Sequence, residues 1–281
     1  MTRLLIALMI GVSASALAWL GARGLFAAPI FARRNVRGLD VPVGAGFLAV
    51  VAVVGVQGIF LVFDAVRVPA DSYAAAGSAV LVAALGFGLL GIIDDLAGDH
   101  GDKGFTGHLR ALASGRLTTG AIKLVGGGLL GLTVAGPSAN GLGELLLGGA
   151  VVALAAYTAN LFDRAPGRVT KVAVVAFVAL VLLTPSDLQP LLVMVGGFVG
   201  AVLGLFPFDL REQLMLGDAG ANPLGAVLGV GVILTTGPTT QLLVLLTLIV
   251  INILGEQMSF SAAIERFAPL RGLDQLGRRP R

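Results

Sequence analysis

Residues 73–99 read YAAAGSAVLVAALGFGLLGIIDDLAGD, and this stretch decides the fold class. Its first 21 residues carry no charge, and the run then ends at a pair of aspartates, Asp94 and Asp95. A helix that crosses the hydrocarbon core of a bilayer needs about 20 mostly apolar residues. The stretch therefore predicts a membrane-spanning helix whose polar end lies at the membrane surface.

Apolar runs of this kind recur along the whole chain of 281 residues. The chain is 56% hydrophobic and only 12% charged, whereas a soluble domain is roughly 25% charged. Because so few charges cannot coat a water-exposed surface, the surface must face lipid. We predict an all-α fold, a polytopic transmembrane helical bundle that forms one domain over residues 1–281. Its nine predicted spans are 4–20, 46–63, 73–93, 118–135, 142–159, 172–183, 190–206, 223–235 and 241–253.

The basic residues lie almost entirely in alternate loops. When successive loops are assigned to opposite faces, one set holds 17 of the 19 Lys and Arg, and the other holds only Arg3 and Arg67. Loops rich in Lys and Arg remain in the cytoplasm, so we predict the N-terminus outside and the C-terminus inside. The first run could also be a cleaved signal peptide, but a retained helix is the simpler interpretation because the basic cluster follows it.

Composition also excludes some kinds of chemistry. The chain has no Cys, which rules out disulfides and thiolate sites, and two His are too few for a His-rich metal site. The net charge of +3 is small, and we expect no nucleic-acid partner. Small residues recur at 126–131, a pattern that packs helices within or between chains, so a homodimer is one expectation.

The unusual polar residues all fall on the predicted cytoplasmic side, on four separate segments. These residues are Asp94, Asp95, Lys123, Asn160, Asp163, Arg164, Arg168 and Asp218. Adjacent carboxylates at a helix end favour a cationic partner, and Mg²⁺ is commonly held by one or two carboxylates together with substrate phosphates. Lysine supplies a compact positive charge for phosphate oxygens. Together these groups are typical of a phosphoryl-transfer site.

Each of these residues also has a purely structural interpretation. The paired aspartates could be a solvated helix end, Lys123 an interfacial anchor, and Asp218 part of a Gly-rich turn. The basic residues near Arg37 are explained by membrane orientation alone. Taken together, these residues indicate a functional site more strongly than any one of them does, because ionisable groups at membrane depth are costly and usually functional.

At these positions the sequence resembles the polyprenyl-phosphate N-acetylhexosamine-1-phosphate transferases (glycosyltransferase family 4), which include the phospho-MurNAc-pentapeptide translocase and the GlcNAc-1-phosphate transferases. The resemblance covers most of the chain in order. The matching segments are RRNVRGLDVPVGAGF (33–47), IIDDLAGD (92–99), Lys123, NLFDRAPG (160–167) and MLGDAGAN (215–222). The histidine-rich motif and final helix of the family are missing, and an Arg-rich tail, SFSAAIERFAPLRGLDQLGRRPR (259–281), follows instead.

The resemblance implies a bacterial cytoplasmic-membrane enzyme that transfers a sugar-1-phosphate from a UDP-sugar to a polyprenyl phosphate, either undecaprenyl or decaprenyl phosphate. The products would be polyprenyl-diphosphate-sugar and UMP, for cell wall biogenesis. It implies Mg²⁺, with Mn²⁺ as an alternative, on Asp218 with Asp94 or Asp95. The implied catalytic residues are Asp94, Asp95, Lys123 and Asp218, and the implied substrate-binding residues are Asn160, Asp163, Arg164, Arg168 and Arg37.

Two other interpretations remain open at this point. The altered loop after Asn160 and the missing histidine motif are compatible with a degenerate, non-catalytic relative that acts as a membrane scaffold. A small transporter is less consistent with the sequence, because its polar groups would line both faces or the middle of the membrane, and the outer loops here are nearly bare of charge.

Overall fold

The computed structural model describes residues 1–67, 73–97, 114–115 and 118–279, and in these residues it is almost entirely helical. Each of the nine predicted spans coincides with a helix, so the predicted all-α membrane bundle is confirmed. These helices are α1 (Thr2–Phe26), α2 (Phe47–Arg67), α3 (Tyr73–Ala97), α5 (Thr119–Ala135), α6 (Leu142–Phe162), α7 (Arg168–Leu183), α8 (Val193–Leu210), α9 (Asp218–Thr235) and α10 (Pro238–Gln257).

Eight of these helices are long and apolar enough to cross a bilayer. The exception is α7, which has 16 residues and so a length of about 24 Å at 1.5 Å per residue. Three short 3-10 helices, Pro29–Phe31, Gly136–Ser138 and Gln189–Leu192, lie in the connections.

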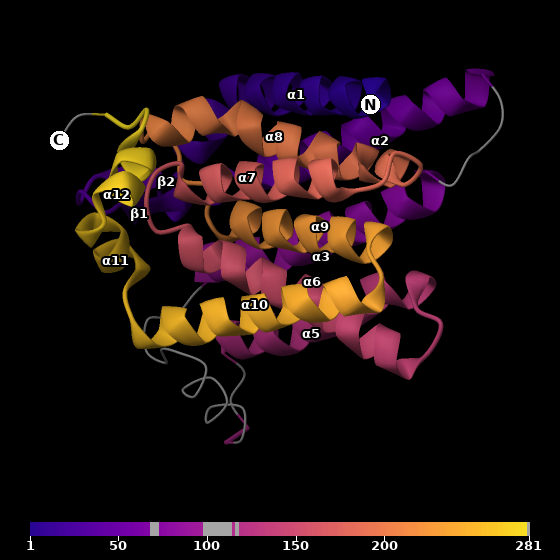
Figure 1. Cartoon of the computed structure of the whole chain (residues 1–281). Coiled ribbons are helices and arrows are strands. Elements are labelled where there is room, and N and C mark those ends of the chain that lie inside the picture. The colour runs from indigo at the N-terminus through magenta and orange to yellow at the C-terminus, as the bar shows by residue number, and fades with distance from the viewer. Residues whose placement is uncertain (68–72, 98–113, 116–117, 280–281) are drawn as a thin grey trace.

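Helix α9 lies at the centre of the bundle, between α3 and α6, with α7 and α8 also against it (Figure 1). In the most apolar 18-residue window of α9, 78% of the residues are buried, whereas none is buried in that of α10, which packs mainly on α6 at the periphery. Helix α1 lies along α8. The sequence of α9 is rich in Gly and Ala. Small residues let helix backbones pack closely in lipid, where the hydrophobic effect does not drive helices together.

One end of the bundle has its own secondary structure, which the sequence analysis did not predict. A two-stranded antiparallel hairpin, β1 (Ala32–Arg34) with β2 (Asp40–Pro42), lies there together with α11 (Phe260–Arg266) and α12 (Ala268–Gln275) (Figure 1). The N-terminus of α1 points toward the opposite end. The hairpin is tied to the bundle because Met215 donates its N–H to the Pro42 carbonyl at 2.7 Å.

Candidate active site

Three predicted residues from three helices meet at the hairpin end of the bundle. The Lys123 ammonium, on the first turns of α5, lies 3.1 Å from Asp94 Oδ2 on the last turn of α3. It also donates a hydrogen bond to Asp218 Oδ2 at the start of α9. All three side chains are largely buried. The structure thus brings two carboxylates from distant parts of the sequence onto one cation.

Asp95 has a different set of partners from Asp94. Its two carboxylate oxygens each accept a backbone N–H at the start of α9, from Asp218 and Ala219, both at 3.0 Å. The first N–H groups of a helix have no partner within the helix, and a carboxylate there is also favoured by the helix dipole. Because Gly217 precedes the helix and has no side chain, α3 supplies the cap that α9 lacks.

The backbone at this junction requires glycine at two positions. Gly217 has φ +69°, a region that L side chains rarely adopt. Gly91, one turn before Asp94 and Asp95, lies so close to α9 that a Cβ there would be 2.2 Å from the Asp218 carbonyl oxygen. The last turn of α3 and the first turn of α9 are therefore in backbone contact, and this contact sets the separation of the carboxylates.

Asn160 and Asp163 flank the cluster from the end of α6. Asn160 donates a side-chain hydrogen bond at 3.1 Å to Asn222, a buried residue one turn beyond Asp218 on α9. Asp163 follows the last residue of α6. Burial raises the pKa of the Asp163 carboxyl well above its usual value, and repulsion from Asp209, Asp218 and Asp95 adds to this. A mobile cation or a basic substrate group would relieve this repulsion.

Neither Asn222 nor Asp209 is conspicuous in the sequence. Asp209, the penultimate residue of α8, is 4% exposed and accepts the Gly167 N–H at 2.8 Å. The one feature of the sequence that could have indicated Asp209 is its position as a carboxylate beside an apolar run. Asn222 lies inside the quoted segment MLGDAGAN, but its partner Asn160 is 62 residues away.

Two of the three predicted substrate-binding arginines bind carboxylates of the chain itself, and the third lines a pocket. The Arg37 guanidinium pairs with Glu212 at 3.1 Å and donates to the Arg279 carbonyl at 2.7 Å. The Arg168 guanidinium is buried and binds the Asp274 carboxylate through two nitrogens, at 2.8 and 3.0 Å. Arg164 is exposed and lines a pocket.

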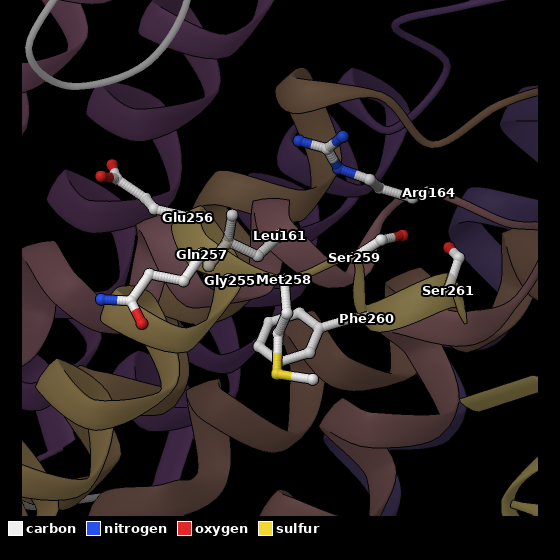
Figure 2. Close-up of a pocket in the computed structure, with 9 residues that line it drawn as sticks. All are labelled: Leu161, Arg164, Gly255, Glu256, Gln257, Met258, Ser259, Phe260 and Ser261. Atoms are coloured by element: carbon white, nitrogen blue, oxygen red, sulfur yellow. The ribbon is translucent and has the colours of Figure 1, made fainter. Parts of the chain in front are cut away.

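That pocket has a volume of about 230 Å³ and lies between the end of α6 and the junction of α10 with α11. Its lining combines Leu161 and Arg164 with the segment 255–261. Figure 2 shows Arg164, Ser259 and Ser261 on one side of it and Glu256 and Gln257 on the other, with the apolar side chains of Met258 and Phe260 between them. The pocket therefore offers donors, acceptors and an apolar surface.

The donor set fits a divalent cation that has substrate among its ligands. Among the described residues, no group of three or more His, Asp or Glu could hold a metal ion by itself. Asp94 and Asp218 nevertheless both reach a single cation, the Lys123 ammonium. Mg²⁺ typically takes one or two carboxylates and completes its shell with phosphates and water. The pair is suited to that role. Asp99, the last residue of the quoted segment IIDDLAGD (92–99), lies outside the described residues.

In the described part of the chain, eight helices that are long and apolar enough to cross a bilayer, with a partly buried Lys–Asp–Asp cluster at one end, define a polytopic membrane protein with an ionic site. The model of glycosyl transferase family 4 matches residues 78–236, more than half of the chain. The chain therefore belongs to this family of transferases, and the resemblance drawn from its motifs is confirmed. A search of curated proteins found no match. The matched region contains every member of the cluster but neither the hairpin nor the tail.

Family membership and the apolar helices together make the chain a multi-pass membrane protein of the sugar-phosphate transferase kind.

Proposed function

We propose that the chain transfers a sugar-1-phosphate from a UDP-sugar to a polyprenyl phosphate at the cytoplasmic face of a bacterial membrane. A phosphate oxygen of the lipid would form a bond to the sugar-linked phosphorus of the donor. The bond between that phosphorus and the bridging oxygen would break, and UMP would leave with the oxygen. The observation that carries the proposal is the convergence of Asp94 and Asp218 on Lys123 at one end of the bundle.

In this proposal the acidic residues have different roles. Asp218 and Asp94 would hold Mg²⁺, or Mn²⁺ in its place, which supplies positive charge to the diphosphate. Asp95 would keep the start of α9, and so Asp218, in position through its two backbone hydrogen bonds. In this assignment Asp94, and not its neighbour Asp95, would contact the metal ion.

Lys123 would neutralise phosphate charge as the donor and acceptor meet. Its long side chain already lies between two carboxylates, and an ammonium is a mobile point charge that can turn toward phosphate oxygens. The lipid phosphate has its second pKa near 6, so it is mostly dianionic at neutral pH. The attacking oxygen therefore needs little help from a base.

The donor would extend from the cluster toward the end of α6. Asn160 and Asp163 border the cluster, and Arg164 lines the neighbouring pocket. A guanidinium is suited to phosphate or carbonyl oxygens. We propose that Asn160 and Asp163 position the diphosphate or nucleoside, and that the pocket beside Arg164 accepts part of the donor.

The test is an assay of purified protein with Mg²⁺, undecaprenyl or decaprenyl phosphate and a panel of UDP-sugars, scored for UMP and lipid-linked product. We expect both products with one sugar, and none when the metal or the lipid is omitted. Asp218→Ala should lower turnover by at least about 10²–10³-fold, as loss of one electrostatic group in an active site does. Asp187→Asn, an exposed site between α7 and α8, is the matched control. Near-normal turnover by Asp218→Ala would refute the assignment.

The alternative is a non-catalytic relative that serves as a membrane scaffold. The observation that favours it is the engagement of Arg37 and Arg168 with the chain's own carboxylates, which leaves fewer cationic side chains for a substrate. The absence of UMP release with every UDP-sugar, from protein that still binds Mg²⁺, would favour the scaffold.

A further inference from the structure

The C-terminal segment α11–α12 is fastened to the start of α7 by a buried ion pair. Arg168 Nε and Nη2 bind the two oxygens of Asp274 at 2.8 and 3.0 Å, and Arg168 Nη1 donates to Ser261 Oγ at 2.8 Å. The Arg168 and Asp274 side chains are 7% and 9% exposed. A bidentate Arg–carboxylate pair is geometrically specific and charge-assisted. It joins residues 106 positions apart in the sequence.

Two further cations strengthen this attachment. Lys171, one turn beyond Arg168, donates to the carbonyls of Leu273, Asp274 and Leu276 at 2.7 to 3.1 Å. These carbonyls lie at the end of α12, where the helix leaves its acceptors unpaired. Arg278 donates to Asp274 Oδ1 at 2.6 Å and to the Pro166 carbonyl at 2.8 Å. The tail is thereby held on both α7 and the loop that precedes it.

The attachment is continuous with the proposed site. Residues 163–167 form the loop between α6 and α7, and this loop includes Asp163, Arg164 and the Pro166 carbonyl that Arg278 binds. Ser261, the second residue that the Arg168 side chain binds, also lines the pocket beside Arg164. Release of the tail would therefore free one wall of the pocket and remove a constraint on the loop.

We propose that Arg168 and Asp274 form a latch that docks α11–α12 onto the 163–167 loop and shapes the pocket beside Arg164. Arg168 is then a positioning residue and makes no direct contact with substrate. The part of this inference that concerns the donor rests on the proposed function. The docking itself does not, because every contact in it lies within the chain.

The experiment compares full-length wild type with Asp274→Asn, Arg168→Gln and the double variant, all purified in detergent. Docking is measured by the rate at which trypsin cleaves within the tail, where Arg266 and Arg271 are exposed but helical. Each single variant should be cleaved at least about tenfold faster, since a hydrogen-bonded charge pair is lost. The double variant should be cleaved about as fast as the faster single variant, and the two effects should not multiply, because both substitutions break the same pair. Asp187→Asn, on the loop at the other end of the bundle, should match wild type.

Activity supplies the second measurement. Asp274→Asn should raise KM for the UDP-sugar severalfold while KM for the polyprenyl phosphate stays unchanged, and Arg168→Gln should have the same effect. Arg278→Gln removes one of the two arginines on Asp274 and should give an intermediate cleavage rate.

Cleavage of Asp274→Asn at the wild-type rate would overturn the latch. If Arg168→Gln changed KM while its cleavage rate stayed normal, and Asp274→Asn had normal kinetics, Arg168 would instead be assigned to direct contact with substrate. If the wild type shows no transferase activity, the proposed function fails, and the cleavage rates still decide the latch.

Discussion

Two neighbouring aspartates in this chain have different surroundings. Asp94 and Asp95 are identical in chemistry and adjacent in sequence, but successive residues on a helix point about 100° apart. Asp94 consequently faces Lys123, whereas both oxygens of Asp95 accept N–H groups of α9. The first is placed to hold a cation, and the second to hold a helix.

Substitution should separate these two roles. Asp95→Ala removes the cap of α9 and should cost about 0.5–2 kcal/mol of stability, so the thermal unfolding midpoint in detergent should fall. Asp95→Asn keeps one acceptor oxygen and should fall less. Asp94→Asn should leave the midpoint near wild type but abolish the rise in midpoint that we expect from Mg²⁺ at the proposed site. An Asp95→Ala protein as heat-stable as wild type would contradict the capping role.

The pKa of Asp274 predicts how docking of the tail depends on pH. Burial opposes ionisation, but the hydrogen bonds and charges of Arg168 and Arg278 outweigh it, so the pKa of Asp274 lies below its usual value of 3.8. A carboxyl with a depressed pKa stabilises the native state above its unfolded-state pKa, and this contribution is lost as the pH falls through the folded-state value. Docking should therefore be constant from pH 7 to 5 and weaken only below about pH 4.

A fluorophore on Gly272→Cys can measure this pH dependence, since a Cβ at Gly272 meets nothing within 4 Å and the chain has no other Cys. Its emission should change below about pH 4 in the Asp274 protein and show no such step in the Asp274→Asn background. A transition between pH 5 and 7 in the Asp274 protein would argue against the ion pair as the fastening.

At the scale of the elements, the contact between α3 and α9 sets the site. Helices α3 and α9 are in backbone contact at Gly91, one turn before the paired aspartates. The hairpin adds to this junction, because Arg33 donates to the carbonyls of Asp95 and Leu96 at 3.0 and 3.2 Å, where α3 ends. The carboxylates are therefore held by packing and capping of whole helices, and loops play a smaller part.

Gly91→Ala tests this contact. The added methyl would meet the Asp218 backbone, so α9 must move, and overpacking of this kind costs about 1–3 kcal/mol. We expect a lower unfolding midpoint together with a loss of turnover of at least about tenfold. Gly58→Ala on α2 is the control, because a Cβ there meets nothing within 4 Å. Wild-type activity in Gly91→Ala would show that the separation of α3 and α9 is not critical.

At the scale of the whole molecule, the described connections lie at the two ends of the bundle. The hairpin, the 163–167 loop and α11–α12 share one end, and the N-terminus points toward the other (Figure 1). The predicted orientation puts the hairpin end in the cytoplasm. A cytosolic nucleotide sugar and the phosphate of a membrane lipid could then meet at Lys123.

Orientation can be measured with single introduced cysteines, because the chain has none of its own. A membrane-impermeant maleimide added to intact cells should label Asp187→Cys and leave Gly272→Cys unlabelled. Both positions are exposed, so permeabilised cells should label both. Labelling of Gly272→Cys in intact cells would reverse the proposed topology.

Length and hydropathy along the chain were enough to predict the nine helices and their type, and the order of the short polar motifs indicated the family. Those properties are local, and a bilayer requires of each helix only a length and an apolar surface. The set Asp94, Lys123 and Asp218 was also predictable as a group, because ionisable residues at membrane depth are rare and conspicuous.

Only the tertiary structure decided which partner each polar group has. The different partners of Asp94 and Asp95 depend on how α3 is rotated against α9. The partners of Arg37 and Arg168 lie in a tail that is 242 and 106 residues away in the sequence. The tail helices and the three-residue strands are too short for a periodic pattern to reveal. Pairings of this kind arise from packing between distant segments, which no local property of the chain encodes.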